Sequence, residues 1–373
     1  MSHPVTTLTP DEARAYLIGQ TGLRASRPAG EDAARALLRE LRCIQLDPLD
    51  VIGTNADLVA MARLDGLRRG DLYRHLFPGG GFEHFAKERC LLPPEAFPYY
   101  RDQAVATPWW RSGDRQRRLP EGILERVLHE VRAHGPLTTA DLSDHGAVEP
   151  IDWSGWKGTA KAASMAIEVL WTRCQVVTCG RSGGRQRLYD VPERQLATHA
   201  AEAEGDFVRW ALRERVEAAG LLSRAGGPWW STLYNDRNGP VPDELLAAGE
   251  LELVVVAGKR REYLAPAGFR DRVFPEDDGR MRILGPLDPL IWDRALVKHA
   301  FGFDYVWEVY KPAEKRRWGW YVCPLLHEGR LVGRFEPAVE DGRVVAKNLW
   351  KEKGVKFSKR AFDAALARHS RLL

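Results

Sequence analysis

Apolar side chains recur at helical spacing through the first three quarters of this 373-residue chain. Thr9 and Glu12 form a start signal for a helix over residues 9–18, because the threonine can cap the first turn and the glutamate completes a capping box. The same spacing of apolar residues predicts further helices over residues 31–43, 56–67 and 82–92. Residues 109–118 are basic and aromatic, and we expect them to form a linker or a surface loop.

Two later stretches each combine helices with a basic hairpin. In both, a glycine-containing basic turn separates two apolar segments that are typical of strands. Three helices followed by such a hairpin form a winged helix, which is a variant of the helix-turn-helix. Residues 9–80 are counted as a first, less regular unit. The elements expected in the two stretches are helices over 121–134, 136–142 and 159–173 with strands over 175–191, and helices over 206–219 and 242–248 with strands over 251–264.

From about residue 281 the apolar residues alternate in short segments, which is typical of closely spaced strands. Strands are predicted over residues 305–310, 318–323, 329–336 and 343–350, followed by a last helix over 358–369. The fold class is therefore α+β and mainly helical, with three tandem winged-helix domains followed by a small C-terminal antiparallel β-barrel. The expected domains are residues 1–118, which include a helical insertion, then 119–195, 196–278 and 279–373.

The net charge of +4 is modest, so the placement of the basic residues matters more than their number. Both hairpin tips are basic, and arginine or lysine on a glycine turn can reach DNA phosphates or a minor groove. A solvated turn is the ordinary alternative, but two tips at equivalent places in repeated modules favour double-stranded DNA as the partner. The predicted DNA-binding residues are Arg181, Arg185 and Arg187 on one tip, and Lys259, Arg260 and Arg261 on the other.

Other function classes lack sequence support. No apolar run approaches the length of a membrane span, and residues 1–10 do not have the pattern of a signal peptide. The five cysteines form no CxxC pair and have no histidine at zinc-finger spacing, so we expect buried thiols, no metal site and no cofactor. We expect a monomer in the cytoplasm, associated with the nucleoid.

Gln45 and Asp47 form the first constellation that could carry chemistry. Pro48 biases Asp47 towards extended geometry, and residues two apart in an extended segment point to the same side. A carboxylate beside an amide can hold and polarise a water molecule. An Asp-Pro turn and a helix-end glutamine are the structural alternatives.

A second constellation places Glu83, His84 and Lys87 within about two turns of the helix expected over residues 82–92. A surface salt bridge between Glu83 and Lys87, four residues apart, is the simplest interpretation. Lys87 could instead form a Schiff base with an abasic sugar, which would give the protein lyase activity.

The chain resembles one family along nearly its whole length. It is similar to the bacterial winged-helix DNA glycosylases that unhook interstrand crosslinks, the YcaQ/AlkZ-like family. The segments that carry the resemblance are Ile44-Gln-Leu-Asp-Pro-Leu, Phe82-Glu-His-Phe, Cys90-Leu-Leu-Pro, Gly155-Trp-Lys, Leu188-Tyr-Asp-Val-Pro-Glu-Arg, Pro286-Leu-Asp-Pro-Leu-Ile-Trp-Asp-Arg and Phe301-Gly-Phe-Asp-Tyr.

The resemblance implies a monofunctional enzyme that hydrolyses the N-glycosidic bond of N7-alkylated guanine, including bulky adducts and crosslinks. It also implies that Gln45 and Asp47 are the catalytic Gln-x-Asp pair, with Asp47 as base and electrostatic stabiliser and Gln45 as the residue that positions water. The base leaves as a good leaving group because N7 alkylation makes it cationic.

The chain departs from the family pattern near the expected substrate pocket. His84, Phe85 and Lys87 stand where relatives often have tyrosine, tryptophan and histidine, and Asn55 follows the catalytic segment where relatives carry arginine and histidine. The expected pocket residues are Asn55, Glu83, His84 and Lys87. These departures leave open the lesion and the role, which is either base excision repair or self-resistance to a DNA-alkylating natural product. A non-enzymatic winged-helix DNA-binding protein, such as a regulator or damage-binding factor, is the alternative.

Overall fold

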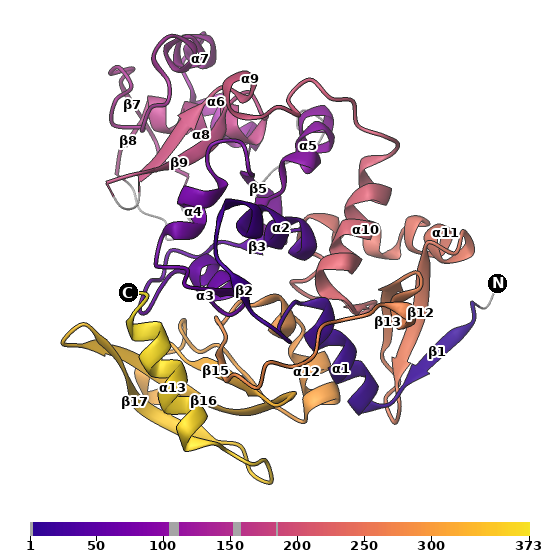
Figure 1. Cartoon of the computed structure of the whole chain (residues 1–373). Coiled ribbons are helices and arrows are strands. Elements are labelled where there is room, and N and C mark those ends of the chain that lie inside the picture. Colours follow the sequence, from indigo (N-terminus) through magenta and orange to yellow (C-terminus); the bar gives the residue numbers. More distant parts are fainter. Residues whose placement is uncertain (1–2, 104–111, 152–157, 184–185) are drawn as a thin grey trace. The chain divides into compact units, whose positions relative to one another are not determined.

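Figure 1 shows the computed structural model, which describes residues 3–103, 112–151, 158–183 and 186–373. Helices and strands alternate in an α+β fold. The chain packs into two compact units, one built from residues 1–75, 85–90 and 208–373 and the other from residues 76–84 and 91–207. Each unit therefore contains segments that are far apart in the sequence.

The first helix has the start that its sequence predicts. Helix α1 (Pro10–Gln20) begins with a complete capping box, in which the Thr9 hydroxyl accepts from the Glu12 amide at 3.1 Å and Glu12 accepts from the Thr9 amide at 2.8 Å. Helix α2 (Glu31–Leu41) is also confirmed, and its leucines are buried. Helix α3 (Asn55–Met61) is shorter than predicted, because the chain turns into the short strand β4 (Leu64–Asp65).

A four-stranded sheet joins the N-terminal segment to the third predicted module. The strand order is β1 (Val5–Leu8), β12 (Leu251–Val256), β13 (Glu262–Pro266) and β11 (Leu222–Ser223), with β1 parallel to β12. The β12–β13 hairpin and the helices α10 (Phe207–Ala219) and α11 (Val241–Ala247) confirm the predicted elements. The pairing of β1 with β12 was not predicted, since parallel pairing leaves no local turn signal.

The C-terminal strands form an open antiparallel sheet in the order β14 (Arg282–Ile283), β15 (Cys323–His327), β16 (Arg330–Glu340) and β17 (Arg343–Lys351). The predicted barrel is not confirmed, because this linear order does not close on itself within the described residues. Residues 305–310 form no strand, and helix α12 (Arg294–Phe301) was not predicted. The last helix, α13 (Lys359–Ser370), is confirmed and its Phe362 packs in the core beside the sheet.

The second unit contains the helices α5 (Phe97–Gln103), α6 (Ser112–Arg118), α7 (Ile123–His134), α8 (Ala162–Thr172) and α9 (Pro192–Gln195) and the hairpin β9 (Val177–Ser182)–β10 (Gln186–Asp190). The long helices and the hairpin agree with the prediction. Two predictions were wrong. Of the loop expected over residues 109–118, residues 109–111 lie outside the described residues and residues 112–118 form helix α6. The helix expected after Pro136 is a turn in which the Asp141 carboxylate accepts from the Thr138 amide and hydroxyl.

The helix predicted over residues 82–92 is instead a hairpin of β5 (Phe82–Ala86) and β6 (Glu88–Leu92). Strand β6 pairs with β3 (Ile44–Gln45), so the sheet order is β3-β6-β5. Alanine, lysine and glutamate favour a helix locally, but tertiary strand pairing overrides this weak preference. Lys87 is thus placed at the tip of a hairpin rather than on a helix face.

The remaining short elements are β2 (Arg27–Pro28), which pairs with β4, helix α4 (Asp71–Leu76) and the pair β7 (Ala147–Val148) and β8 (Ala160–Lys161). Among the described residues, no helix is both long and apolar enough to cross a membrane. The number of winged helices and the four domain boundaries stay predictions.

Candidate active site

Gln45 lies at the end of β3 and is held at both its main chain and its side chain. Its carbonyl oxygen accepts a hydrogen bond from Asn55 Nδ2 at 2.8 Å, and its side-chain Oε1 accepts one from Lys87 Nζ at 2.6 Å. The Leu46 amide donates to the Arg89 carbonyl at 2.8 Å, which continues the pairing of β3 with β6. Only 7% of Gln45 is exposed. Its position is therefore fixed by the sheet and by two buried polar side chains.

Lys87 is buried, with 4% of its surface exposed, at the tip of the β5–β6 hairpin. The Thr232 hydroxyl holds this tip by donating to the Ala86 carbonyl at 2.9 Å. The Lys87 ammonium lies 5.2 Å from the centre of the Trp292 ring, within the range of a cation–π contact. Burial lowers the pKa of Lys87 to about 8. The predicted Glu83–Lys87 salt bridge was wrong, since Lys87 bonds Gln45 instead.

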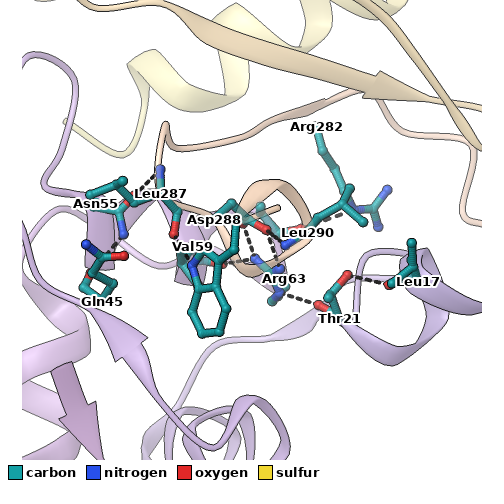
Figure 2. Close-up of polar contacts among 12 residues, drawn as sticks. Leu17, Thr21, Gln45, Asn55, Val59, Arg63, Arg282, Leu287, Asp288 and Leu290 are labelled. Atoms are coloured by element: carbon teal, nitrogen blue, oxygen red, sulfur yellow. Dashed lines mark hydrogen bonds and ion pairs between the residues drawn. The ribbon is translucent and has the colours of Figure 1, made fainter. Parts of the chain in front are cut away.

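A second series of contacts connects Gln45 to Lys87 through Asn55, Leu287 and Trp292. Asn55 Oδ1 accepts from the Leu287 amide at 3.2 Å, and the Leu287 carbonyl accepts from Trp292 Nε1 at 2.9 Å. Figure 2 shows Asn55 joined by these hydrogen bonds to Gln45 on one side and to Leu287 on the other. The ring of Trp292 faces Lys87, so the five residues form a closed circuit of polar contacts around Gln45.

The segment that contains Leu287 is anchored by a buried ion pair between Arg63 and Asp288. Arg63 donates to both oxygens of Asp288, at 2.8 and 3.0 Å, and neither side chain is more than 2% exposed. Arg63 also donates to the Thr21 carbonyl at 2.6 Å and to the Val59 carbonyl at 2.8 Å (Figure 2). Since these contacts engage all three guanidinium nitrogens, the ion pair fixes the backbone at Leu287 relative to α3.

Asp47 and Asp288 occupy the same tetrapeptide, Leu-Asp-Pro-Leu, and make the same local hydrogen bond, although only Asp288 begins a 3-10 helix (Pro289–Ile291). In each, one carboxylate oxygen accepts from the amide two residues later, at 2.9 Å from Leu49 and 3.0 Å from Leu290. Asp288 has Arg63 as its counter-ion, whereas within the described residues no lysine or arginine pairs with Asp47. Asp47 is therefore a half-buried carboxylate with one oxygen available to a water molecule.

The environment of Asp47 makes it a better proton acceptor than an exposed aspartate. Burial raises the pKa of Asp47, while the hydrogen bond from the Leu49 amide acts in the opposite direction. Burial is the main cause that raises the pKa of the Tyr321 phenol, and neighbouring negative charges, including that of Asp47, raise this pKa further. Whether Gln45 and Asp47 share one face, as the sequence predicts, stays a prediction, because regular strand geometry ends at Gln45.

Glu83 and His84 lie in the core of the second unit. The buried carboxylate of Glu83 forms ion pairs with Arg181 and, at 3.5 Å, with Arg187. His84 Nε2 contacts the Thr172 carbonyl at 3.2 Å, and its ring lies 5.0 Å from that of Trp171. Of the four expected pocket residues, Asn55 and Lys87 are thus brought to Gln45, while the role of Glu83 and His84 stays a prediction.

The predicted DNA-binding residues differ in their surroundings. Lys259 and Arg260 are exposed at the β12–β13 turn, and Arg261 lies 3.7 Å from Asp293. Arg181 and Arg187 are partly engaged by Glu83, and Arg187 also pairs with Glu168 at 3.2 Å. Arg185 lies outside the described residues.

Three contributors to the site were not predicted from the sequence, namely Trp292, Leu287 and the Arg63–Asp288 pair. The available signal was the segment Leu-Asp-Pro-Leu, which occurs at residues 46–49 and 287–290, but the residues on either side of the two copies do not match. In the parts of the chain that the structure covers, no three His, Cys, Asp or Glu side chains gather in a group that could hold a metal ion. The five cysteines are buried and unpaired by disulfides.

Gln45 and Asp47 lie two residues apart in the chain, and a carboxylate that no described cation pairs with can accept a proton from water. The fold is similar to that of the Streptomyces sahachiroi DNA glycosylase AlkZ, with a TM-score of 0.59 and 16% sequence identity over 98% of this chain and 97% of that one. Residues 38–372 match the family model described as DNA glycosylase AlkZ-like. The chain belongs to this family and is a DNA glycosylase. The resemblance found in the sequence is confirmed, and an enzyme is favoured over a non-enzymatic DNA-binding protein.

Proposed function

We propose that this DNA glycosylase hydrolyses the N-glycosidic bond of N7-alkylated guanine in double-stranded DNA, including bulky adducts and interstrand crosslinks. The observation that carries the proposal is the contrast between Asp47 and Asp288. Among the described residues no cation pairs with Asp47, which suits a group that must stabilise positive charge on a substrate.

The proposed chemistry needs few groups. Guanine alkylated at N7 is cationic and leaves without a strong general acid, so the enzyme must mainly stabilise an oxocarbenium-like sugar and deliver water. Asp47 would do both, as the carboxylates of glycoside hydrolases do. Its raised pKa favours acceptance of the proton that the attacking water loses at C1′. Gln45 would position that water.

A base-release assay tests the proposal. The protein is incubated with duplex DNA that contains N7-methylguanine or a nitrogen-mustard crosslink, and free base is measured above the rate without enzyme. Asp47→Asn keeps the shape of the side chain but removes its charge, and should slow release by about 100-fold or more. Asp341→Asn, in the exposed turn between β16 and β17, is the matched control. Absence of release by the wild type from every N7-alkylated substrate would refute the proposal.

The residues that contact DNA, the oligomeric state and the cellular role are part of the same proposal. Arg181, Arg185, Arg187, Lys259, Arg260 and Arg261 would contact the phosphates, since their charges suit a polyanion. We propose a monomer that acts in the cytoplasm on nucleoid DNA, either in base excision repair or in self-resistance to a DNA-alkylating natural product. Comparison of release rates from a methyl adduct and from a bulky adduct would separate general repair from a specialised role.

A further inference from the structure

The hydrogen bond between Lys87 and Gln45 fixes which end of the Gln45 amide is free. A lysine ammonium donates three hydrogen bonds and accepts none, so the atom it contacts at 2.6 Å has to be the amide oxygen. The assignment of Oε1 and Nε2 of Gln45 is therefore set by chemistry and is not an arbitrary choice between two similar atoms. Nε2 is the end of the amide that remains available.

Nothing in the described part of the protein competes for that end of the amide. No hydrogen bond from Gln45 Nε2 to a described residue is found, and Nε2 does not belong to the buried polar atoms that lack a partner. Gln45 Nε2 is therefore accessible to solvent. Gln45 presents two N–H donors there and no acceptor.

We propose that Lys87 is a positioning residue that holds Gln45 as a hydrogen-bond donor to the attacking water. The proposal rests on the function proposed above. A water molecule that accepts from Nε2 keeps both of its own hydrogens, one of which it can donate to Asp47, and retains a lone pair for attack at C1′. With Oε1 turned outward, the amide would accept a water hydrogen in competition with the Asp47 carboxylate.

The surroundings of Lys87 hold its side chain in this place. Trp292 presents its ring to the ammonium, and its own N–H is tied to Leu287, which is tied to Asn55 and so to the main chain of Gln45. The same contacts therefore hold both the donor, Lys87, and the acceptor, Gln45, in place. The titratable and charged groups that interact electrostatically with Lys87 include Cys90 and Glu88 on β6, Arg215 on α10, Arg294 on α12 and Cys43 just before β3.

The charge state of Lys87 decides how firmly the amide is held. As the ammonium loses its proton, the neutral amine gains a lone pair and can accept from Nε2 as well as donate to Oε1. Both orientations of the amide are then satisfied, and the preference for an outward Nε2 is lost. Because burial lowers the pKa of Lys87 to about 8, this change occurs as the pH rises through about 8.

A single-turnover assay of base release from N7-methylguanine DNA tests the proposal with wild type, Lys87→Met, Gln45→Ala and the double variant between pH 6.5 and 9. Loss of a hydrogen bond to a charged group should slow release by Lys87→Met roughly 10- to 100-fold at pH 7. In the Gln45→Ala background Lys87→Met should cause no further loss, because the two residues act as one unit. Lys359→Met, on the exposed face of α13, is the matched control.

The pH profile gives a reading that a purely structural lysine would not change. The wild-type rate should fall as pH rises through about 8, and Lys87→Met should lack that alkaline decline. A wild-type profile without the decline, or a full further loss in the double variant, would overturn the proposal. Covalent trapping of DNA by borohydride, abolished in Lys87→Met, would overturn it in favour of a Schiff-base role. If wild type releases no base at all, the proposed function fails instead.

Discussion

The buried ammonium of Lys87 should make the stability of the protein rise with pH in a way that Lys87→Met removes. An unfolded chain exposes the lysine, which then has its ordinary pKa of 10.5, whereas burial lowers the pKa to about 8 in the folded state. Between these two values the unfolded state binds more protons than the folded state. The free energy of unfolding must therefore increase with pH in this window.

The size of the effect follows from the two pKa values. Each tenfold difference in proton affinity corresponds to about 1.4 kcal/mol, so the whole window contributes about 3 kcal/mol. Below pH 7 the lysine is charged in both states and contributes no slope. Between pH 7 and 9 the expected gain is about 1 kcal/mol, which lies within the precision of denaturation experiments.

The assay is urea unfolding of wild type and Lys87→Met at pH 7 and pH 9, followed by circular dichroism. Groups other than Lys87 titrate in both proteins, so the difference between them isolates the Lys87 proton. Wild type should gain about 1 kcal/mol relative to the variant at the higher pH. A difference that does not change with pH would show that Lys87 is not buried as an ammonium, and would remove the basis for its control of Gln45. Lys359→Met, an exposed lysine, should behave as wild type.

Three further predictions concern the site and its support. The wild-type base-release rate should also fall at acid pH, because the protonated form of Asp47 cannot accept a proton. Burial raises the pKa of Asp47, so the midpoint of this fall should lie above the usual 3.8. A pH–rate profile that is flat at acid pH would contradict this prediction. Asp288→Asn leaves the charge of Arg63 unpaired and should lower the free energy of unfolding, measured in urea, by about 3–5 kcal/mol. The control variant Asp65→Asn, in the more exposed pair with Arg280, should lower it by at most about 1 kcal/mol. Replacing Lys259 and Arg260 by alanine should weaken DNA binding and reduce the slope of log affinity against log salt by about 2, whereas an unchanged slope in a salt titration would exclude both from phosphate contact.

Much of the secondary structure was predictable because it depends on local signals. The capping box at Thr9, the leucine face of α2 and the glycine-containing turns of the two hairpins are all interactions between neighbours in the sequence. The hairpin at residues 82–92 was not predictable in this way. Its residues favour a helix, and only pairing with β3, some forty residues earlier in the chain, makes them strands.

The site shows the same limit. The sequence alone indicated Gln45 and Asp47, since Pro48 marks the end of a helix and the family pattern marks the pair. It also suggested that Lys87 belongs near the pocket, but it paired Lys87 with Glu83 on a helix. The strand geometry instead takes Glu83 to Arg181 and Lys87 to Gln45.

The two Leu-Asp-Pro-Leu segments separate what the sequence determined from what the tertiary structure decided. In both segments the aspartate accepts a hydrogen bond from the amide two residues later. The sequence says no more, because this hydrogen bond depends only on these few residues. The fate of each remaining carboxylate oxygen depends on whether a distant cation is brought to it. The fold brings Arg63 to Asp288 and makes it a structural anchor, whereas it brings no described cation to Asp47, the residue that we propose acts on water.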